Sequence, residues 1–101
     1  MTDFLRPPSS FVKVINKRRY NTGTATLLAS LAGTGRTTHL YKTPRGNYFA
    51  LHLTLWQGES ARVEPLSPEE AQRLYETADA SYYGRVYLGY EEALGITPED
   101  A

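Results

Sequence analysis

The amino-acid sequence predicts an α+β fold in which a small antiparallel sheet of three to four strands is packed by one or two helices, in β-α-β-β-β-α order. A proline-glycine turn between two β-rich runs is typical of an antiparallel hairpin. The run after this turn alternates large apolar residues with others, as a strand does when one face is buried. An amphipathic segment that begins at Ser67 supplies a helix to cover such a sheet.

The length and composition predict one globular domain. The chain has 101 residues, of which 41% are hydrophobic and 22% charged, proportions typical of packed proteins. Residues 1–10 contain a Pro-Pro-Ser-Ser run and predict a flexible N-terminal arm. Residues 96–101 predict an acidic C-terminal tail, so the folded domain is expected at residues 11–95.

The first predicted strand covers residues 11–15, where β-branched residues dominate, and a turn follows at residues 16–18. Residues 24–32 are predicted to form a short helix. Thr22 can cap its start, and Gly33-Thr34-Gly35 can end it. Three apolar residues fall on one face of that helix, Ala25, Leu28 and Leu31.

The hairpin is predicted at residues 40–49. Pro44 suits the first corner of a type I turn, and Gly46 supplies a left-handed residue. Its second strand continues to Trp56, and the face expected to form the core carries Phe49, Leu51, Leu53 and Leu55. After a turn at residues 57–60, a third strand at residues 61–65 completes a meander.

The main helix is predicted to start at Ser67, with proline in the first helical position and Glu70 completing a capping box. Apolar residues then recur at helical spacing at Ala71, Leu74, Tyr75 and Ala78. Residues 81–94 fit either a second helix or a strand, and a helix is the preferred prediction.

The charge is divided unequally along the chain although the formal net charge is zero. Residues 1–58 hold eight bases and one acid, whereas residues 59–101 hold three bases and ten acids. Such a division can create one basic and one acidic surface, each able to steer a partner of opposite charge, although folding can also interleave the charges.

Several classes of function have no support in the residues. The absence of cysteine excludes disulfides, thiol catalysis and zinc sites that need cysteine. No run is long and apolar enough for a membrane span, and the N-terminus lacks a signal-peptide segment, so a cytoplasmic protein with no membrane partner is expected. His39 and His52 are the only histidines, and neither lies near a serine nucleophile motif. We therefore expect no enzyme activity, catalytic residue, metal or cofactor.

One group of residues is compatible with nucleic acid. Cations can neutralise phosphates, and the tyrosines interleaved with them can stack on unpaired bases. The candidate nucleic-acid-binding residues are Lys17, Arg18, Arg19, Lys42 and Arg45. The ten acids of the second half oppose general phosphate binding, and short basic turns are commonly solvated surface.

A second group is compatible with a protein interface. Tyrosine and arginine dominate interface hot spots because rigid rings bury much area, and the chain has eight tyrosines. The candidate partner-binding residues are Trp56, Tyr83, Tyr87, Tyr90, Glu91 and Glu92. The tyrosines can equally pack on the sheet, and a homodimer through these tyrosines or through Trp56 is a further alternative.

Three segments resemble the successive signatures of small accessory proteins of phages and mobile genetic elements. They are residues 14–25 (VINKRRYNTGTA), 40–49 (LYKTPRGNYF) and 65–71 (PLSPEEA), and their order and spacing also agree with that group. The chain departs from the pattern by lacking the glycine usual after Asn16, and by an apolar strand at residues 49–56 where others are glycine-rich.

The resemblance implies a non-enzymatic inhibitor of a host defence complex, of the anti-CRISPR type, that occludes a surface of a host protein or ribonucleoprotein complex. It carries over no catalytic residue. The alternative, from the residues themselves, is a small nucleic-acid-binding regulator that uses the basic N-terminal half.

Overall fold

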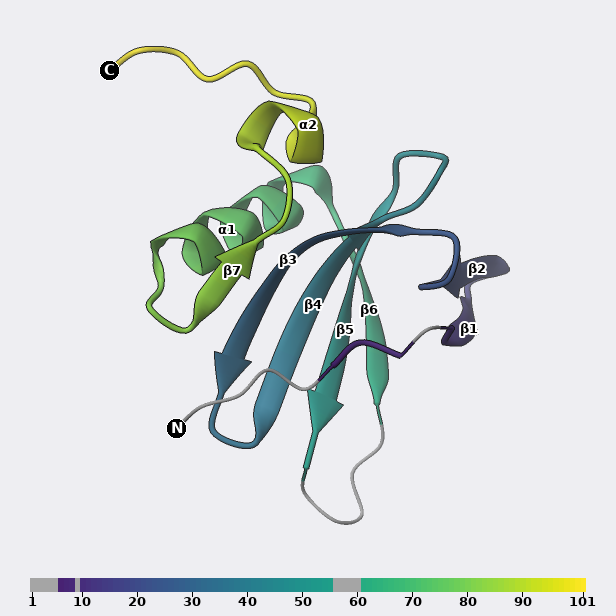
Figure 1. The fold of residues 1–101 in the computed structure, drawn as a ribbon. Coiled ribbons are helices and arrows are strands. Elements are labelled where there is room, and N and C mark those ends of the chain that lie inside the picture. The colour runs from purple at the N-terminus through teal and green to yellow at the C-terminus, as the bar shows by residue number, and fades with distance from the viewer. Residues whose placement is uncertain (1–5, 9, 56–60) are drawn as a thin grey trace.

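The computed structural model describes residues 6–8, 10–55 and 61–101. Five strands form one antiparallel sheet: β3 (Thr26–Gly33), β4 (Arg36–Lys42), β5 (Tyr48–Thr54), β6 (Arg62–Leu66) and β7 (Gly84–Val86). Their order in the sheet is β6-β5-β4-β3-β7. The strands β1 (Val12–Ile15) and β2 (Arg18–Asn21) pair separately as a hairpin. The helices are α1 (Pro68–Ala80) and α2 (Tyr90–Leu94), as Figure 1 shows.

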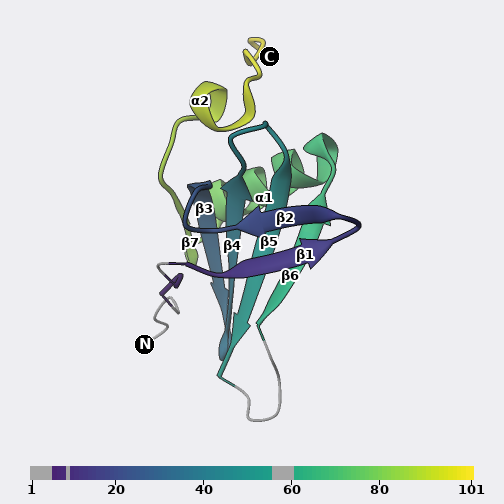
Figure 2. The ribbon, with the colours of Figure 1, turned by 90° about the vertical axis from the view of Figure 1, so that its right-hand side faces the viewer.

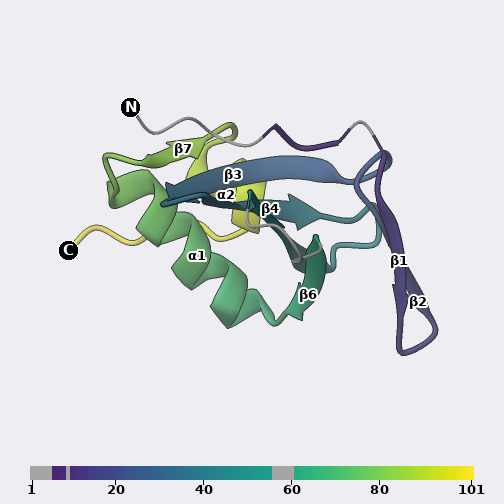
Figure 3. The ribbon, with the colours of Figure 1, turned by 90° about the horizontal axis from the view of Figure 1, so that it is seen from below.

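The five-stranded sheet is buried on both faces. On one face it packs against α1 (Figure 3). That helix buries Ala71, Tyr75 and Ala78 in one cluster with sheet residues such as Leu40. On the other face the hairpin contributes Tyr20, whose ring meets the Phe49 ring edge-on at a centroid distance of 5.4 Å. The hairpin therefore rests on its own aromatic cluster, apart from the core under α1.

The predicted fold class was wrong in the number and order of its strands. Residues 24–32, predicted as a helix, form most of β3, an interior strand of the sheet that pairs with both β4 and β7. Apolar residues at a spacing of three are consistent with one face of a helix. A strand buried on both faces is apolar at nearly every position, so it also contains this spacing and lacks the alternation that usually identifies a strand. Gly33-Thr34-Gly35 accordingly belongs to the β3–β4 connection, in which Gly35 has a φ of 66°.

The four predicted strands and the main helix are confirmed. The strands predicted at residues 11–15, 40–49 and 61–65 correspond to β1, the β4–β5 hairpin and β6. The α1 capping box is complete, since the Glu70 backbone N–H donates to Ser67 Oγ at 3.1 Å and the Ser67 N–H donates to Glu70 Oε1 at 2.9 Å.

The segment at residues 81–94 is neither one helix nor one strand. Residues 84–86 form the edge strand β7, and a single short helical turn, α2, begins at Tyr90. Leu55 also departs from prediction, because it is 71% exposed although it was expected in the core with Leu51. It follows the last residue of β5, beyond the part of the sheet that is covered.

Some predicted features lie outside the described residues: the turn at residues 57–60, Trp56, and residues 1–5 and 9 of the N-terminal arm. In the part of the chain that the structure does describe, no helix has the length and apolar character needed to cross a membrane.

Candidate nucleic-acid interface

A basic cleft opens between the β1–β2 hairpin and the β4–β5 turn, with a volume of about 670 Å³. Figure 2 shows β2 to be the hairpin strand that lies nearer this turn. Four cationic side chains line the basic cleft, Lys17, Arg18, Arg19 and Arg45. The remaining lining residues are uncharged: Tyr20, Asn21, Thr24, Thr43, Pro44 and Asn47.

Two tight turns hold these cations in place. Lys17 lies at the tip of the β1–β2 turn, and Arg18 and Arg19 are the first two residues of β2. On the other side of the cleft, Arg45 sits in a turn that is closed by a Gly46 N–H bond to the Thr43 carbonyl at 2.9 Å. The Thr43 N–H donates to the Asn47 carbonyl at 2.7 Å, so this turn is fixed from both ends.

The electrostatics of the basic cleft favour an anion. No carboxylate of the described residues lines it, and all four cationic side chains are exposed. Within the described ranges, none of these four cations forms an ion pair. Four unpaired positive charges that face one cavity raise the local concentration of anionic ligands and the rate at which they arrive.

Lys17 occupies a backbone position that favours glycine. Asn16 and Lys17 have φ values of 51° and 65°, the left-handed pair of a two-residue hairpin turn. Asparagine tolerates this conformation, but a residue such as lysine there costs roughly 1–2 kcal/mol. The chain thus keeps a cation at the tip of the hairpin despite a local cost in stability, which is a pattern associated with functional positions.

The fifth cation predicted for this site lies elsewhere. Lys42 is paired with Tyr48 across β4 and β5, and its Nζ lies 5.5 Å from the centre of the Tyr48 ring. Tyr48 belongs to the core under α1, so Lys42 is on the opposite sheet face from the hairpin cluster. The polar residues Asn21 and Asn47 line the cleft but were not predicted, although Asn47 immediately follows the predicted turn at Pro44 and Gly46.

The residues predicted as a protein interface do not form one stripe. Tyr83 and Tyr87 lie on either side of β7, and Tyr90 opens α2 together with Glu91 and Glu92. Tyr90 donates its hydroxyl to Glu76 Oε2 at 3.0 Å, and the Tyr87 hydroxyl lies 3.1 Å from Ser30 Oγ. These two tyrosines therefore have structural contacts within the fold.

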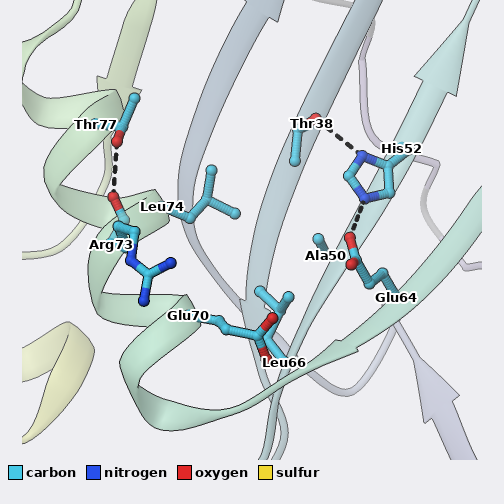
Figure 4. Close-up of a pocket in the computed structure, with 9 residues that line it drawn as sticks. All are labelled: Thr38, Ala50, His52, Glu64, Leu66, Glu70, Arg73, Leu74 and Thr77. Atoms are coloured by element: carbon cyan, nitrogen blue, oxygen red, sulfur yellow. Dashed lines mark hydrogen bonds and ion pairs between the residues drawn. The ribbon is translucent and has the colours of Figure 1, made fainter.

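His52 lies on the wall of a groove of about 330 Å³ between the sheet and α1 (Figure 4). Its Nδ1 lies 3.0 Å from Thr38 Oγ1, and its Nε2 lies 2.8 Å from Glu64 Oε1. Spacing in the sequence cannot reveal this contact with Glu64, since the two residues meet only because β5 pairs with β6. Both ring nitrogens are engaged, which leaves neither of them available to a substrate in this arrangement.

His39 lies in a buried polar cluster on the hairpin side of the sheet. Its Nδ1 is 2.6 Å from Ser30 Oγ, and its side chain is fully buried. Burial, together with the nearby Tyr87, raises the pKa of Tyr41 in the same region to about 12. A histidine beside a serine is a pairing used in nucleophilic catalysis, but here neither side chain is accessible to a substrate.

The described residues contain no candidate metal site, since no three or more of their histidine, aspartate or glutamate side chains are placed together to hold an ion.

The chain matches no protein-family model, no curated protein and no solved structure. The candidate site therefore stands on its own geometry.

Proposed function

We propose that this protein is a small nucleic-acid-binding protein that acts without catalysis, as a regulator, through the basic cleft. The observation that supports the proposal is the convergence of Lys17, Arg18, Arg19 and Arg45 on one cavity that no carboxylate of the described residues lines. The phosphate backbone of nucleic acid offers several negative charges at short, regular spacing, which converging cations can neutralise. Asn21 and Asn47 add hydrogen-bonding groups to the same cavity.

The first prediction concerns salt dependence. If all four cations contact phosphates, the logarithm of the association constant should fall against the logarithm of salt concentration with a slope of about −3.6 for duplex DNA, and the slope becomes about −2.7 if one of the four contacts a base instead. Arg18→Ala and Arg45→Ala should each reduce the steepness of that slope by about one, because each removes one phosphate contact. Fluorescence anisotropy of labelled duplexes across a salt series measures both quantities.

Arg73→Ala is the matched control, since Arg73 is an exposed cation on α1 and does not line the basic cleft. It should leave the slope unchanged. A flat salt response of the unaltered protein, or an equal effect of all three variants, would refute phosphate binding in the cleft.

A second candidate function is inhibition of a host defence complex by occlusion of a protein surface. We propose it as the alternative because Tyr82 and Tyr83 form an exposed aromatic pair, with ring centroids 5.1 Å apart and exposed fractions of 93% and 50%. Exposed tyrosines next to one another are typical anchors of protein interfaces. Nothing in the described residues buries the Tyr82 ring within this chain.

The second prediction separates the two functions. If the inhibitor proposal is right, the tagged protein should recover a stoichiometric protein partner from host lysate after nuclease treatment, and Tyr82→Ala with Tyr83→Ala should abolish that recovery. Mass spectrometry identifies the partner. Recovery that disappears with nuclease, or with Arg18→Ala and Arg45→Ala instead, favours nucleic-acid binding.

A further inference from the structure

The β1–β2 hairpin is a two-stranded ribbon that stands to one side of the main sheet, with its turn directed away from the rest of the chain (Figure 3). Its inward face supplies Ile15 and Tyr20 to the aromatic cluster around Phe49. Because side chains alternate along a strand, the register of the hairpin defines the other face. Val12 is opposite Asn21 and Val14 is opposite Arg19, so these four share the outward face.

The two outward valines have no structural explanation within the described fold. Val12 and Val14 are 48% and 58% exposed, whereas Ile15 on the same strand packs inward. Exposed valines between cationic and amide side chains are uncommon on a solvated surface, which favours charged and polar residues at such positions. The outward face of the ribbon therefore has the composition of a contact surface.

The chemistry of the four outward side chains matches that of the bases in the major groove of DNA. Arginine can donate two hydrogen bonds to the O6 and N7 atoms of guanine, and asparagine can pair with N6 and N7 of adenine. Apolar groups contact the thymine methyl. Asn21 is also oriented in advance, because its Oδ1 accepts a hydrogen bond from the Gly23 N–H at 2.8 Å and keeps a second lone pair for another donor.

The width and length of the β1–β2 hairpin also fit the major groove of DNA. A major groove of about 12 Å admits a two-stranded β-ribbon, whose strands lie about 4.8 Å apart. The four residues of each strand extend about 13 Å, which corresponds to roughly four base-pair steps of 3.4 Å. Duplex RNA does not offer this surface, because its major groove is deep and narrow.

We propose that the β1–β2 hairpin enters the major groove of duplex DNA and reads a short sequence with Arg19 and Asn21, while Val12 and Val14 contact thymine methyl groups. This inference rests on the proposed nucleic-acid-binding function and specifies its ligand. Lys17 at the tip, Arg18 on the inward side of β2 and Arg45 on the neighbouring turn are placed to contact the phosphates beside the groove.

Arg18 and Arg19 provide a matched pair for the test, because they are exposed neighbours on β2 whose side chains leave opposite faces of the ribbon. Each alanine variant removes one charge. The protein is incubated with duplexes that have a randomised core, bound duplexes are sequenced, and anisotropy then measures affinity for the enriched and a scrambled duplex. Circular dichroism checks that each variant remains folded.

We expect enrichment of a motif of roughly four base pairs. Arg19→Ala should reduce the preference for the enriched over the scrambled duplex by about ten-fold, the usual effect of losing one bidentate base contact. Arg18→Ala should weaken binding to both duplexes equally and leave their ratio unchanged. Asn21→Ala should relax the preference at a different position of the motif from that affected by Arg19→Ala.

Different outcomes refute the two proposals. If salt-dependent binding is found but single strands bind as tightly as duplexes, or Arg19→Ala and Arg18→Ala have the same effect on the ratio, groove reading is wrong and the proposed function stands. If no nucleic acid binds at all, the proposed function itself is wrong.

Discussion

Replacing Phe49 by alanine is expected to lower the free energy of unfolding by about 3–5 kcal/mol, the usual cost of removing a large aromatic side chain from a core. Phe49 is fully buried on β5. Its ring is stacked on that of Tyr41 at 5.1 Å and meets that of Tyr20 at 5.4 Å. The change therefore removes both aromatic contacts and leaves a cavity that the paired strands on either side cannot close.

The loss of the Phe49 ring should also disturb the basic cleft. Tyr20 lines the cleft and is the hairpin residue that rests on the Phe49 ring. A two-stranded hairpin is marginally stable without such support. Since a domain of this kind has about 5–15 kcal/mol of stability in total, Phe49→Ala should leave a marginally folded protein in which the proposed DNA binding is weakened.

Urea unfolding followed by circular dichroism measures the effect of Phe49→Ala. Tyr82→Ala is its control, because it removes an aromatic ring that is 93% exposed and should change the stability by less than about 0.5 kcal/mol. If both variants unfold at the same urea concentration, Phe49 does not hold the hairpin to the sheet as described.

Local signals accounted for the elements that the sequence predicted well. The β4–β5 hairpin depends on a turn of a few residues, with Pro44 and Gly46 at positions that their own backbone preferences favour. The start of α1 depends equally on near neighbours, because the capping box joins Ser67 and Glu70. Such features require no knowledge of the rest of the chain.

The errors lay where distant parts of the chain decide the structure. The strand β3 lies in the interior of the sheet because β4 and β7 pair with it from either side, and β7 comes more than fifty residues later. Its leucine and alanine residues suit a strand that is buried on both faces. That burial depends on distant parts of the chain, so the periodicity of the sequence alone does not reveal it. The assignment of residues 81–94 failed for the same reason, since β7 is a strand only through its pairing with β3.

The candidate site was predictable only in part. The run Lys17, Arg18 and Arg19 is evident in the sequence, but its proximity to Arg45 depends on how the hairpin packs across the sheet. Lys42 shows that proximity in the sequence can also mislead, because it is close to Arg45 in the sequence but lies on the opposite face of the sheet from the hairpin. The outward set of Val12, Val14, Arg19 and Asn21 follows from the register of β1 and β2, which a correct prediction of the two-residue turn would have provided.

Replacing Gly84 by alanine is expected to separate β7 from α1 and to destabilise the protein by about 3 kcal/mol, at the upper end of the usual range for overpacking. A Cβ atom on Gly84 would lie 2.6 Å from the Ala78 carbonyl carbon, 2.7 Å from its Cα and closer still to its oxygen. These are backbone atoms within α1, so no side-chain rotation can relieve the clash. Either the strand or the end of the helix must move.

Such a movement would break a defined set of contacts. The Gly84 N–H donates to the Ser81 carbonyl at 3.1 Å, and residues 84–86 pair with β3. The Ala32 N–H also donates to the Tyr83 carbonyl at 2.9 Å, and the Tyr87 N–H donates to the Leu28 carbonyl at 2.9 Å. Amide hydrogen exchange should therefore show loss of protection along the β7 edge of β3, while the β1–β2 hairpin on the other sheet face remains protected.

Gly89→Ala is the matched control for Gly84→Ala. Gly89 has a φ of −65°, and a Cβ placed there meets no atom within 4 Å. The same chemical change should accordingly alter the free energy of unfolding by less than about 1 kcal/mol. Because the basic cleft lies away from β7, Gly84→Ala should retain the proposed salt-dependent DNA binding under conditions in which it remains folded. Equal stability of the two alanine variants would show that β7 does not pack on α1 as closely as described.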